Sequence, residues 1–358
     1  MNALAQRIAQ MIGMQGPISV SQFMAMALHD STLGYYATHD PIGAGGDFIT
    51  APEISQMFGE MLGLWCVQAW RDQGSPSPAR LVELGPGRGT LMADALRAAR
   101  LDPEFLANIE VVLLEASVEL QKQQAATLET AQCPVPVRWV DHLDETLSDR
   151  PLFLLANEFF DALPIRQSVF TERGWCERMV VVNGQGGLAF AAAPVATMLA
   201  ISSERGLPEP GAIYETSPAA EAIVAQIAHI IAEKGGAALI VDYGYGANSG
   251  FAETLQAVAQ HKFTTVLDNP GEADLSAHVD FAALARMAVE AGAKAYGPIE
   301  QGEFLCGLGI VSRAERLSRN HLQNVERQLN RLLGAEEMGT LFKALAIMPK
   351  HAPAPPGF

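Results

Sequence analysis

The sequence predicts an α/β fold in which helices cover a mainly parallel sheet. From Arg80 onward, short apolar strands alternate with helical stretches, as is typical of parallel strands joined by crossover helices. The 358 residues are 49% hydrophobic and 18% charged, a composition typical of a globular protein that buries a sizeable core. We therefore expect a folded protein rather than a disordered chain.

Five strands of this sheet are expected from their apolar runs. They lie at 81–85 (LVELG), 109–115 (IEVVLLE), 137–140 (VRWV), 152–158 (LFLLANE) and 237–244 (AALIVDYG). Between the fourth and fifth, apolar runs separated by glycine-rich turns predict an antiparallel flap inserted at about 164–215. Two further edge strands, expected from 264–268 (TTVLD) and 300–310 (EQGEFLCGLGI), would make the sheet seven-stranded.

Three parts of the chain are expected along the sequence. Residues 1–76 read as an N-terminal helical region that carries a long loop, 77–312 as the α/β core with its flap, and 313–358 as a C-terminal helical extension. The loop contains Tyr35, Tyr36 and several glycines after residue 42, which suits a lid that closes over a ligand; an ordered but inert loop is the alternative. The tail at 351–358 is expected to fray.

Charge and cysteine usage exclude several classes of function. The formal net charge of -16 disfavours nucleic acid and favours a cationic partner, although acidity can also serve solubility alone. The four cysteines lie far apart and predict neither a metal site nor a disulfide framework. No apolar run is long enough to span a membrane, and residues 1–16 lack the layout of a secretory signal, which predicts a bacterial cytoplasmic protein rather than a mitochondrial one.

A glycine-rich loop follows the first strand and predicts a nucleotide-type ligand. Gly85-Pro86-Gly87-Arg88-Gly89 runs into a helix, whose N-terminus favours an anionic group. A dinucleotide fingerprint requires glycine or alanine where this chain has Thr90, and the lysine of a phosphate-binding P-loop is absent. The pattern E-x-G-x-G-x-G from Glu83 instead resembles motif I of the Rossmann-like class I methyltransferases, which bind the methionine part of S-adenosylmethionine there.

Three further residues are assigned to the same cofactor site. Glu115 ends the second strand, where a carboxylate can accept hydrogen bonds from both ribose hydroxyls. Asp141 follows the third strand, where class I methyltransferases usually contact adenine, although a surface turn explains it equally well. Asn157 ends the fourth strand, at the sheet edge where α/β sites form.

Three acidic residues are candidates for the methyl acceptor site. Glu158 follows the fourth strand and is the first candidate to hold the group that accepts the methyl. Asp161 could join it, or could cap a helix starting at Ala162. Glu53 either shares the site or answers Thr50 in a capping box that opens the next helix, and both roles can hold together.

Longer segments of the chain resemble one family, the MidA or mitochondrial complex I assembly-factor methyltransferases. They are GDFITAPEISQMFGE at 46–60, LVELGPGRGTLMADALR at 81–97, NEFFDALPI at 157–165, and shorter matches at 242–245, 274–281, 301–310 and 338–347. The resemblance implies a protein arginine N-methyltransferase whose mitochondrial members act on the 49-kDa subunit of respiratory complex I. The alternatives are a small-molecule N- or O-methyltransferase and a non-catalytic assembly factor that binds S-adenosylmethionine. A homodimer is also possible.

Overall fold

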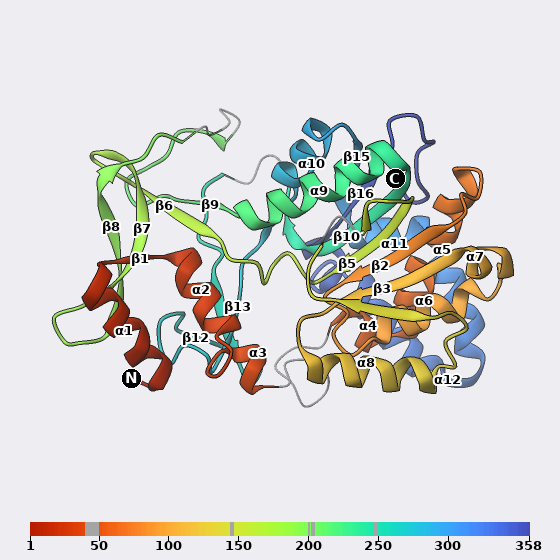
Figure 1. The fold of residues 1–358 in the computed structure, drawn as a ribbon, viewed down its shortest axis with the longest axis horizontal. Helices are drawn as coiled ribbons and strands as arrows, with labels where there is room; N and C mark the ends of the chain where they lie inside the picture. Colours follow the sequence, from red (N-terminus) through yellow and green to blue (C-terminus); the bar gives the residue numbers. More distant parts are fainter. Residues whose placement is uncertain (40–49, 144–146, 200, 202–204, 247–249) are drawn as a thin grey trace. The chain divides into compact units, whose positions relative to one another are not determined.

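In the computed structural model, which describes residues 1–39, 50–143, 147–199, 201, 205–246 and 250–358, the chain divides into two units (Figure 1). The flap unit comprises Met1–Phe48, Asp161–Ala220 and Tyr245–Asp280, and the sheet unit comprises Ile49–Phe160, Glu221–Gly244 and Phe281–Phe358. Each unit is assembled from three separate stretches, whereas the parts expected from the sequence were continuous, with boundaries near 76 and 312. Strand pairing between distant stretches produces this interleaving.

The sheet unit is built around a mainly parallel sheet. Its strands are β2 (Ala79–Leu84), β3 (Ile109–Leu114), β4 (Val137–Val140), β5 (Leu152–Asn157), β10 (Gly236–Tyr245), β15 (Lys294–Glu300) and β16 (Phe342–Met348). They run in the order β15-β16-β10-β5-β2-β3-β4, with β16 antiparallel to both neighbours and all other neighbours parallel. All five strands expected from the apolar runs are present. The expected count of seven strands is not confirmed, because the short β14 (Val279–Asp280) also pairs with β10 and is an eighth strand over the described residues.

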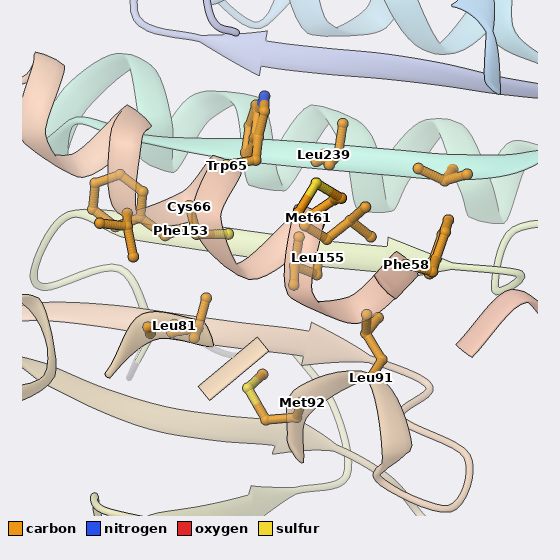
Figure 2. Packing of buried hydrophobic residues seen from close by; sticks show 14 of the residues in the cluster. Phe58, Met61, Trp65, Cys66, Leu81, Leu91, Met92, Phe153, Leu155 and Leu239 are labelled. Carbon is orange, nitrogen blue, oxygen red and sulfur yellow. The ribbon is translucent and has the colours of Figure 1, made fainter. Parts of the chain in front are cut away.

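Helices pack on both faces of this sheet (Figure 1). They are α4 (Ala51–Ile54), α5 (Gln56–Asp72), α6 (Thr90–Ala99), α7 (Pro103–Asn108), α8 (Val118–Thr130), α9 (Pro218–Lys234), α10 (Phe281–Glu290), α11 (Gln301–Gly307), α12 (Ile310–Leu333) and α13 (Met338–Leu341). Figure 2 shows Phe58, Met61 and Trp65 of α5 packed against strand residues such as Leu81 and Leu239. Phe58, Met61 and Trp65 follow one another at three- and four-residue spacing, so they lie on the side of α5 that enters the core.

The antiparallel edge of the sheet differs from the prediction. Residues 301–310 form α11 and the start of α12 rather than a strand, because Phe304 and Leu305 are buried from a helix and Gly302 lets α11 approach Leu333 closely. The strand at this edge is β15, and its neighbour β16 lies within the range expected to be a helical extension. The short apolar run of β16 does not by itself distinguish a strand from a helix segment.

The end of the chain is packed rather than frayed, contrary to the prediction. The Phe358 ring lies 5.2 Å from the Phe304 ring, and Trp65 Nε1 donates a hydrogen bond to the Pro356 carbonyl at 3.2 Å. These contacts fix the tail on α5 and α11. Helix α12 begins before the expected extension, at Ile310, and ends at Leu333 with Gly334 as its C-cap.

The flap unit joins the N-terminal helices to antiparallel strands. Its elements are α1 (Ala3–Gln15), β1 (Ile18–Ser19), α2 (Val20–His29), α3 (Tyr35–Thr38), β6 (Arg166–Thr171), β7 (Gly174–Val182), β8 (Leu188–Ala196), β9 (Ile213–Thr216), β11 (Gln256–Ala259), β12 (Lys262–Thr264), β13 (Asp274–Ser276) and β14 (Val279–Asp280). The inserted antiparallel flap is present as β6, β7 and β8. Residues 264–268 were expected to form an edge strand. Thr264 is instead the last residue of β12, and the residues after it form mainly a turn.

The two tyrosines assigned to a lid belong to the core of the flap unit. Tyr35 is fully buried in α3, and the hydroxyl of Tyr36 lies 3.4 Å from Asp274 Oδ1. The glycines Gly43, Gly45 and Gly46 lie outside the described residues. None of the helices in the described part of the chain is long and apolar enough to cross a membrane.

Candidate cofactor and acceptor site

The loop after β2 has a backbone that only glycine adopts without strain. Gly85, Gly87 and Gly89 have φ angles of +59°, +54° and +81°, all in the left-handed region. A Cβ on Gly85 would lie 2.8 Å from the Phe159 ring. The Pro86 carbonyl accepts a hydrogen bond from Gly89 N at 2.7 Å, which tightens the turn into α6 at Thr90. The loop therefore presents bare backbone at a helix N-terminus, as a nucleotide-type ligand requires.

Glu83 is a buried acid in β2. Burial raises the pKa of its carboxyl to about 8, against the lowering effect of a hydrogen bond from the Met92 backbone. No described residue gives Oε2 a hydrogen bond. The side chain is thus held mostly protonated at neutral pH, and one of its oxygens is available to a further donor.

Glu115 stands directly after β3, as predicted. Its backbone N–H donates to the Val140 carbonyl at 2.8 Å, which joins the ends of β3 and β4. Its side chain accepts hydrogen bonds from Ser117 N at 2.8 Å and from Gln124 Nε2 at 3.2 Å. Burial raises the pKa of the Glu115 carboxyl, and these donors lower it again in part.

The other two assigned cofactor residues differ in burial. Asn157, at the end of β5, is buried, and its Nδ2 donates to Glu158 Oε1 at 3.0 Å. No described residue donates to its Oδ1. Asp141 follows β4 with an exposed side chain whose carboxylate lies 2.5 Å from the ring of His142. Its contact with adenine stays a prediction.

The turn after β5 holds Glu158 in an unusual conformation. Glu158 has a φ of +50°, which costs a non-glycine residue about 1–3 kcal/mol unless its surroundings fix it. Asp242, fully buried at the end of β10, accepts hydrogen bonds from Phe159 N at 3.1 Å and Phe160 N at 2.9 Å. The neighbouring strand therefore stabilises the turn through the Asp242 carboxylate.

The Glu158 carboxylate reaches the short helix α4. Its Oε1 accepts a hydrogen bond from Ala51 N at 2.9 Å, which satisfies a backbone donor at the start of that helix. The expected capping box at Thr50 is wrong, since the Thr50 side chain makes no capping bond and α5 begins separately with Ser55 as its cap.

Glu53, in the same helix α4, reaches the glycine loop. Its Oε1 accepts a hydrogen bond from Thr90 Oγ1 at 2.6 Å, at the first residue of α6. Helix α4 therefore joins the end of β5, through Glu158, to the start of α6, through Thr90. The structure brings together Glu53, Glu158 and the loop, which lie more than 25 residues apart in the sequence.

Asp161 belongs to the flap unit, whereas Glu158 belongs to the sheet unit. Its carbonyl accepts a hydrogen bond from Ala277 N at 2.9 Å, and its charge contributes to the raised pKa of Tyr36. The alternative role as a helix cap is wrong, because residues 161–163 form a turn and β6 follows at Arg166. Pro164 explains this, since the residue before a proline avoids helical geometry.

The sheet unit offers what S-adenosylmethionine needs. The loop exposes backbone through its left-handed glycines, Glu115 presents a carboxylate one strand away, and Glu83 and Asn157 each hold a buried oxygen to which no described residue donates. Polar atoms buried without a partner are rare, and a bound ligand is one way to satisfy them. Residues 61–299 match a family described as S-adenosyl-L-methionine-dependent methyltransferases. The chain belongs to this family.

Curated relatives that match almost the whole chain are also named methyltransferases. The zebrafish (Danio rerio) protein named protein arginine methyltransferase NDUFAF7, mitochondrial, is 38% identical, over 97% of this chain and 87% of its own length. The human protein of the same name is 37% identical, over 93% of this chain and 80% of its own length. Both names place the relatives in mitochondria, so the predicted bacterial cytoplasmic location is wrong. The apolar spacing of residues 4–12 reflects the packing of α1 and does not report the location of the protein in the cell.

A solved structure supports both the fold and the cofactor. A Burkholderia thailandensis protein solved with bound S-adenosyl-homocysteine, the demethylated form of the cofactor, is 30% identical and superposes with a TM-score of 0.86. The match covers 99% of this chain and 94% of the other. The chain is an S-adenosylmethionine-dependent methyltransferase with a class I fold, as its motif I predicts.

Proposed function

We propose that this methyltransferase modifies an arginine side chain of a protein substrate, and that Glu158 holds the guanidinium. The observation that carries the proposal is the geometry of Glu158, an acid kept in a left-handed turn at the carboxyl end of β5. A strained backbone turn held by Asp242, with its carboxylate fixed by Ala51 N, is typical of a functional position. The relatives named protein arginine methyltransferase favour arginine over other acceptors.

The chemistry places clear demands on these residues. S-adenosylmethionine supplies an electrophilic methyl carbon, and the acceptor nitrogen must lie in line with it. A guanidinium is planar, protonated at neutral pH and equipped with a fork of N–H donors, so a fixed carboxylate orients it and stabilises its charge. The nitrogen that gains the methyl group releases one proton, and a nearby carboxylate is a suitable acceptor for it.

Glu53 and Asp161 have different places in this proposal. Glu53 already accepts a hydrogen bond from Thr90, so we assign it to hold α4 against the glycine loop and to add negative charge beside Glu158. Asp161 follows the turn and could contribute its carboxylate to the same acceptor, a role that rests on its closeness in sequence to Glu158. Asp141 and Asn157 complete the proposed cofactor contacts.

The substrate implied by the family resemblance is the 49-kDa-type subunit of respiratory complex I or its homologue. The net charge of -16 supports a basic target segment, since opposite charge speeds encounter and suppresses wrong partners. A homodimer of the chain stays a prediction.

The test is to map where the methyl group goes. The protein is incubated with methyl-labelled S-adenosylmethionine and a lysate of its source cells, and labelled peptides are identified by mass spectrometry, with Glu158→Gln as the matched control. We expect label on an arginine of one protein, and loss of that label when a recombinant copy of it carries lysine instead. Label confined to small molecules would overturn the proposal in favour of a small-molecule methyltransferase.

A further inference from the structure

Gln124 is a buried polar residue that the cofactor motifs do not include. It lies in the middle of α8 and is fully buried, although that helix faces solvent along much of its length. A Cβ on Gly89 would lie 3.3 Å from the Gln124 backbone, so α8 packs directly against the glycine loop. A buried amide at this place must find partners for all of its polar atoms.

The orientation of the Gln124 amide is fixed by Trp139 in β4. The indole Nε1 can only donate, and it donates to Gln124 Oε1 at 2.8 Å. The amide oxygen is therefore committed to β4, and the two N–H groups of Nε2 must point the other way. No flipped orientation of the amide satisfies the indole.

Both donors of Nε2 are used on the cofactor site. One reaches the Gly87 carbonyl at 2.8 Å, and the other reaches Glu115 Oε2 at 3.2 Å. A single side chain thus joins the loop to the acid after β3. The other carboxylate oxygen, Oε1, accepts from Ser117 N.

We propose that Gln124 is the positioning residue of the cofactor site, which holds the glycine loop and the Glu115 carboxylate at the separation that the methionine and ribose parts of S-adenosylmethionine require. It acts through Gly87 and Glu115 and need not touch the cofactor itself. Without the two N–H donors of Gln124, the Gly87 carbonyl and the Glu115 carboxylate would each lose a neutral hydrogen-bond partner. The distance between them would then no longer be fixed.

Gln124 also lowers the pKa of the Glu115 carboxyl. Burial raises the pKa of the Glu115 carboxyl, and the groups that lower it are the Ser117 and Ala116 backbone amides and the Gln124 side chain. All three donors are neutral, so no change of charge on them complicates the effect. Removing Gln124 would raise the pKa of Glu115 further, and a protonated carboxyl accepts hydrogen bonds from ribose hydroxyls less well.

The test compares Gln124→Leu with Leu128→Ala, a change at a buried position one turn along the same helix. Affinity for S-adenosyl-homocysteine is measured by calorimetry from pH 5 to pH 8, and thermal stability is measured without ligand. We expect Gln124→Leu to lose about tenfold in affinity at neutral pH, the scale of one lost hydrogen bond. The pH at which binding is half lost should move upward. Leu128→Ala should lower the melting temperature and leave both binding quantities unchanged.

Trp139→Phe provides a second variant in case Gln124→Leu does not fold. This variant removes the indole donor that orients the amide but keeps the Gln124 side chain itself, whose N–H groups can still donate. We expect a smaller loss of affinity, about threefold, with the pH of half-binding moved in the same direction. Unchanged affinity and an unchanged pH of half-binding in the folded variants would overturn the proposal. So would an equal loss in Leu128→Ala, because the effect would then be one of helix stability alone.

Discussion

The carboxyl ends of β2 and β3 differ from the carboxyl end of β5 in what fixes their geometry. After β2 and β3, the left-handed glycines and Glu115 each stand directly at the end of their strand, so both positions can be recognised from the sequence, although Gln124 joins them. After β5, Glu158 depends on Asp242 and Ala51, which lie 84 and 107 residues away. The first region is a local motif, and the second is assembled by tertiary contacts. We therefore expect the first to govern the cofactor and the second to govern the acceptor.

The largest expected effect comes from the loop itself. Gly87→Val places a β-branched residue at a φ of +54°, where its backbone is strained by roughly 3 kcal/mol. The loop is expected to change conformation to relieve this strain, and cofactor affinity should then fall about 100-fold. Calorimetry with S-adenosyl-homocysteine measures this loss. Gly186→Val, at a φ of +82° in the flap with nothing within 4 Å of its Cβ, is the matched control. If both variants bound equally well, the loop would not be the cofactor site.

A smaller effect is expected at Glu115. Glu115→Ala should weaken cofactor binding by about 2 kcal/mol, the scale of a hydrogen bond to a charged group, while the protein stays folded. Equilibrium binding and a thermal melt of the same preparation separate the two quantities. A collapse of stability without cofactor would show that the Glu115 side chain is structural, through its bonds with Ser117 and Gln124.

On the acceptor side, Asp242→Asn tests the turn. Replacing one carboxylate oxygen by an amide removes at least one of its bonds to the backbone, and we expect a loss of about 1–2 kcal/mol in unfolding free energy. Methyl transfer should fall while cofactor affinity holds. Asp149→Asn, at a half-exposed aspartate paired with Arg80 and Arg150, should lose less than about 1 kcal/mol. Weakened cofactor binding in Asp242→Asn would show that the region after β5 also governs the cofactor, against the division between the two regions.

A further effect is expected in the pH dependence of stability. Because the folded pKa of Glu83 is raised to about 8, the folded state keeps a proton that the unfolded state gives up near its ordinary pKa. Stability contributed by this group is present below that ordinary pKa and is lost as the pH rises toward 8. Glu83→Gln should flatten the fall in unfolding free energy between pH 5 and pH 8, measured by urea titration. The exposed Glu104→Gln should keep the wild-type slope; an unchanged slope in Glu83→Gln would refute the raised pKa.

These two regions also mark what the sequence could predict. The five parallel strands, the loop and Glu115 were predicted because apolar runs and glycines act over a few residues. Glu53 was expected to share the site, to answer Thr50 in a capping box, or both. Its contact with Thr90 was not predicted, because no spacing rule reports a contact across 37 residues. Gln124 carries no sequence signal, since an amide in a helix is ordinary until the fold buries it. Strand β16, between β15 and β10, was missed because its apolar run fits a helix as well as a strand.

The most direct measurement is a paired one on Glu158→Gln. The neutral amide keeps the shape of the side chain and removes the charge that would hold a guanidinium, so cofactor affinity should stay within about twofold and methyl transfer to the mapped arginine should fall about 100-fold. Calorimetry gives the first quantity and mass spectrometry of the substrate protein gives the second, on one preparation. Glu115→Ala, measured beside it, should show the opposite order of effects. Normal transfer in Glu158→Gln would remove Glu158 from the acceptor site, and lost cofactor binding would contradict the division between the two regions.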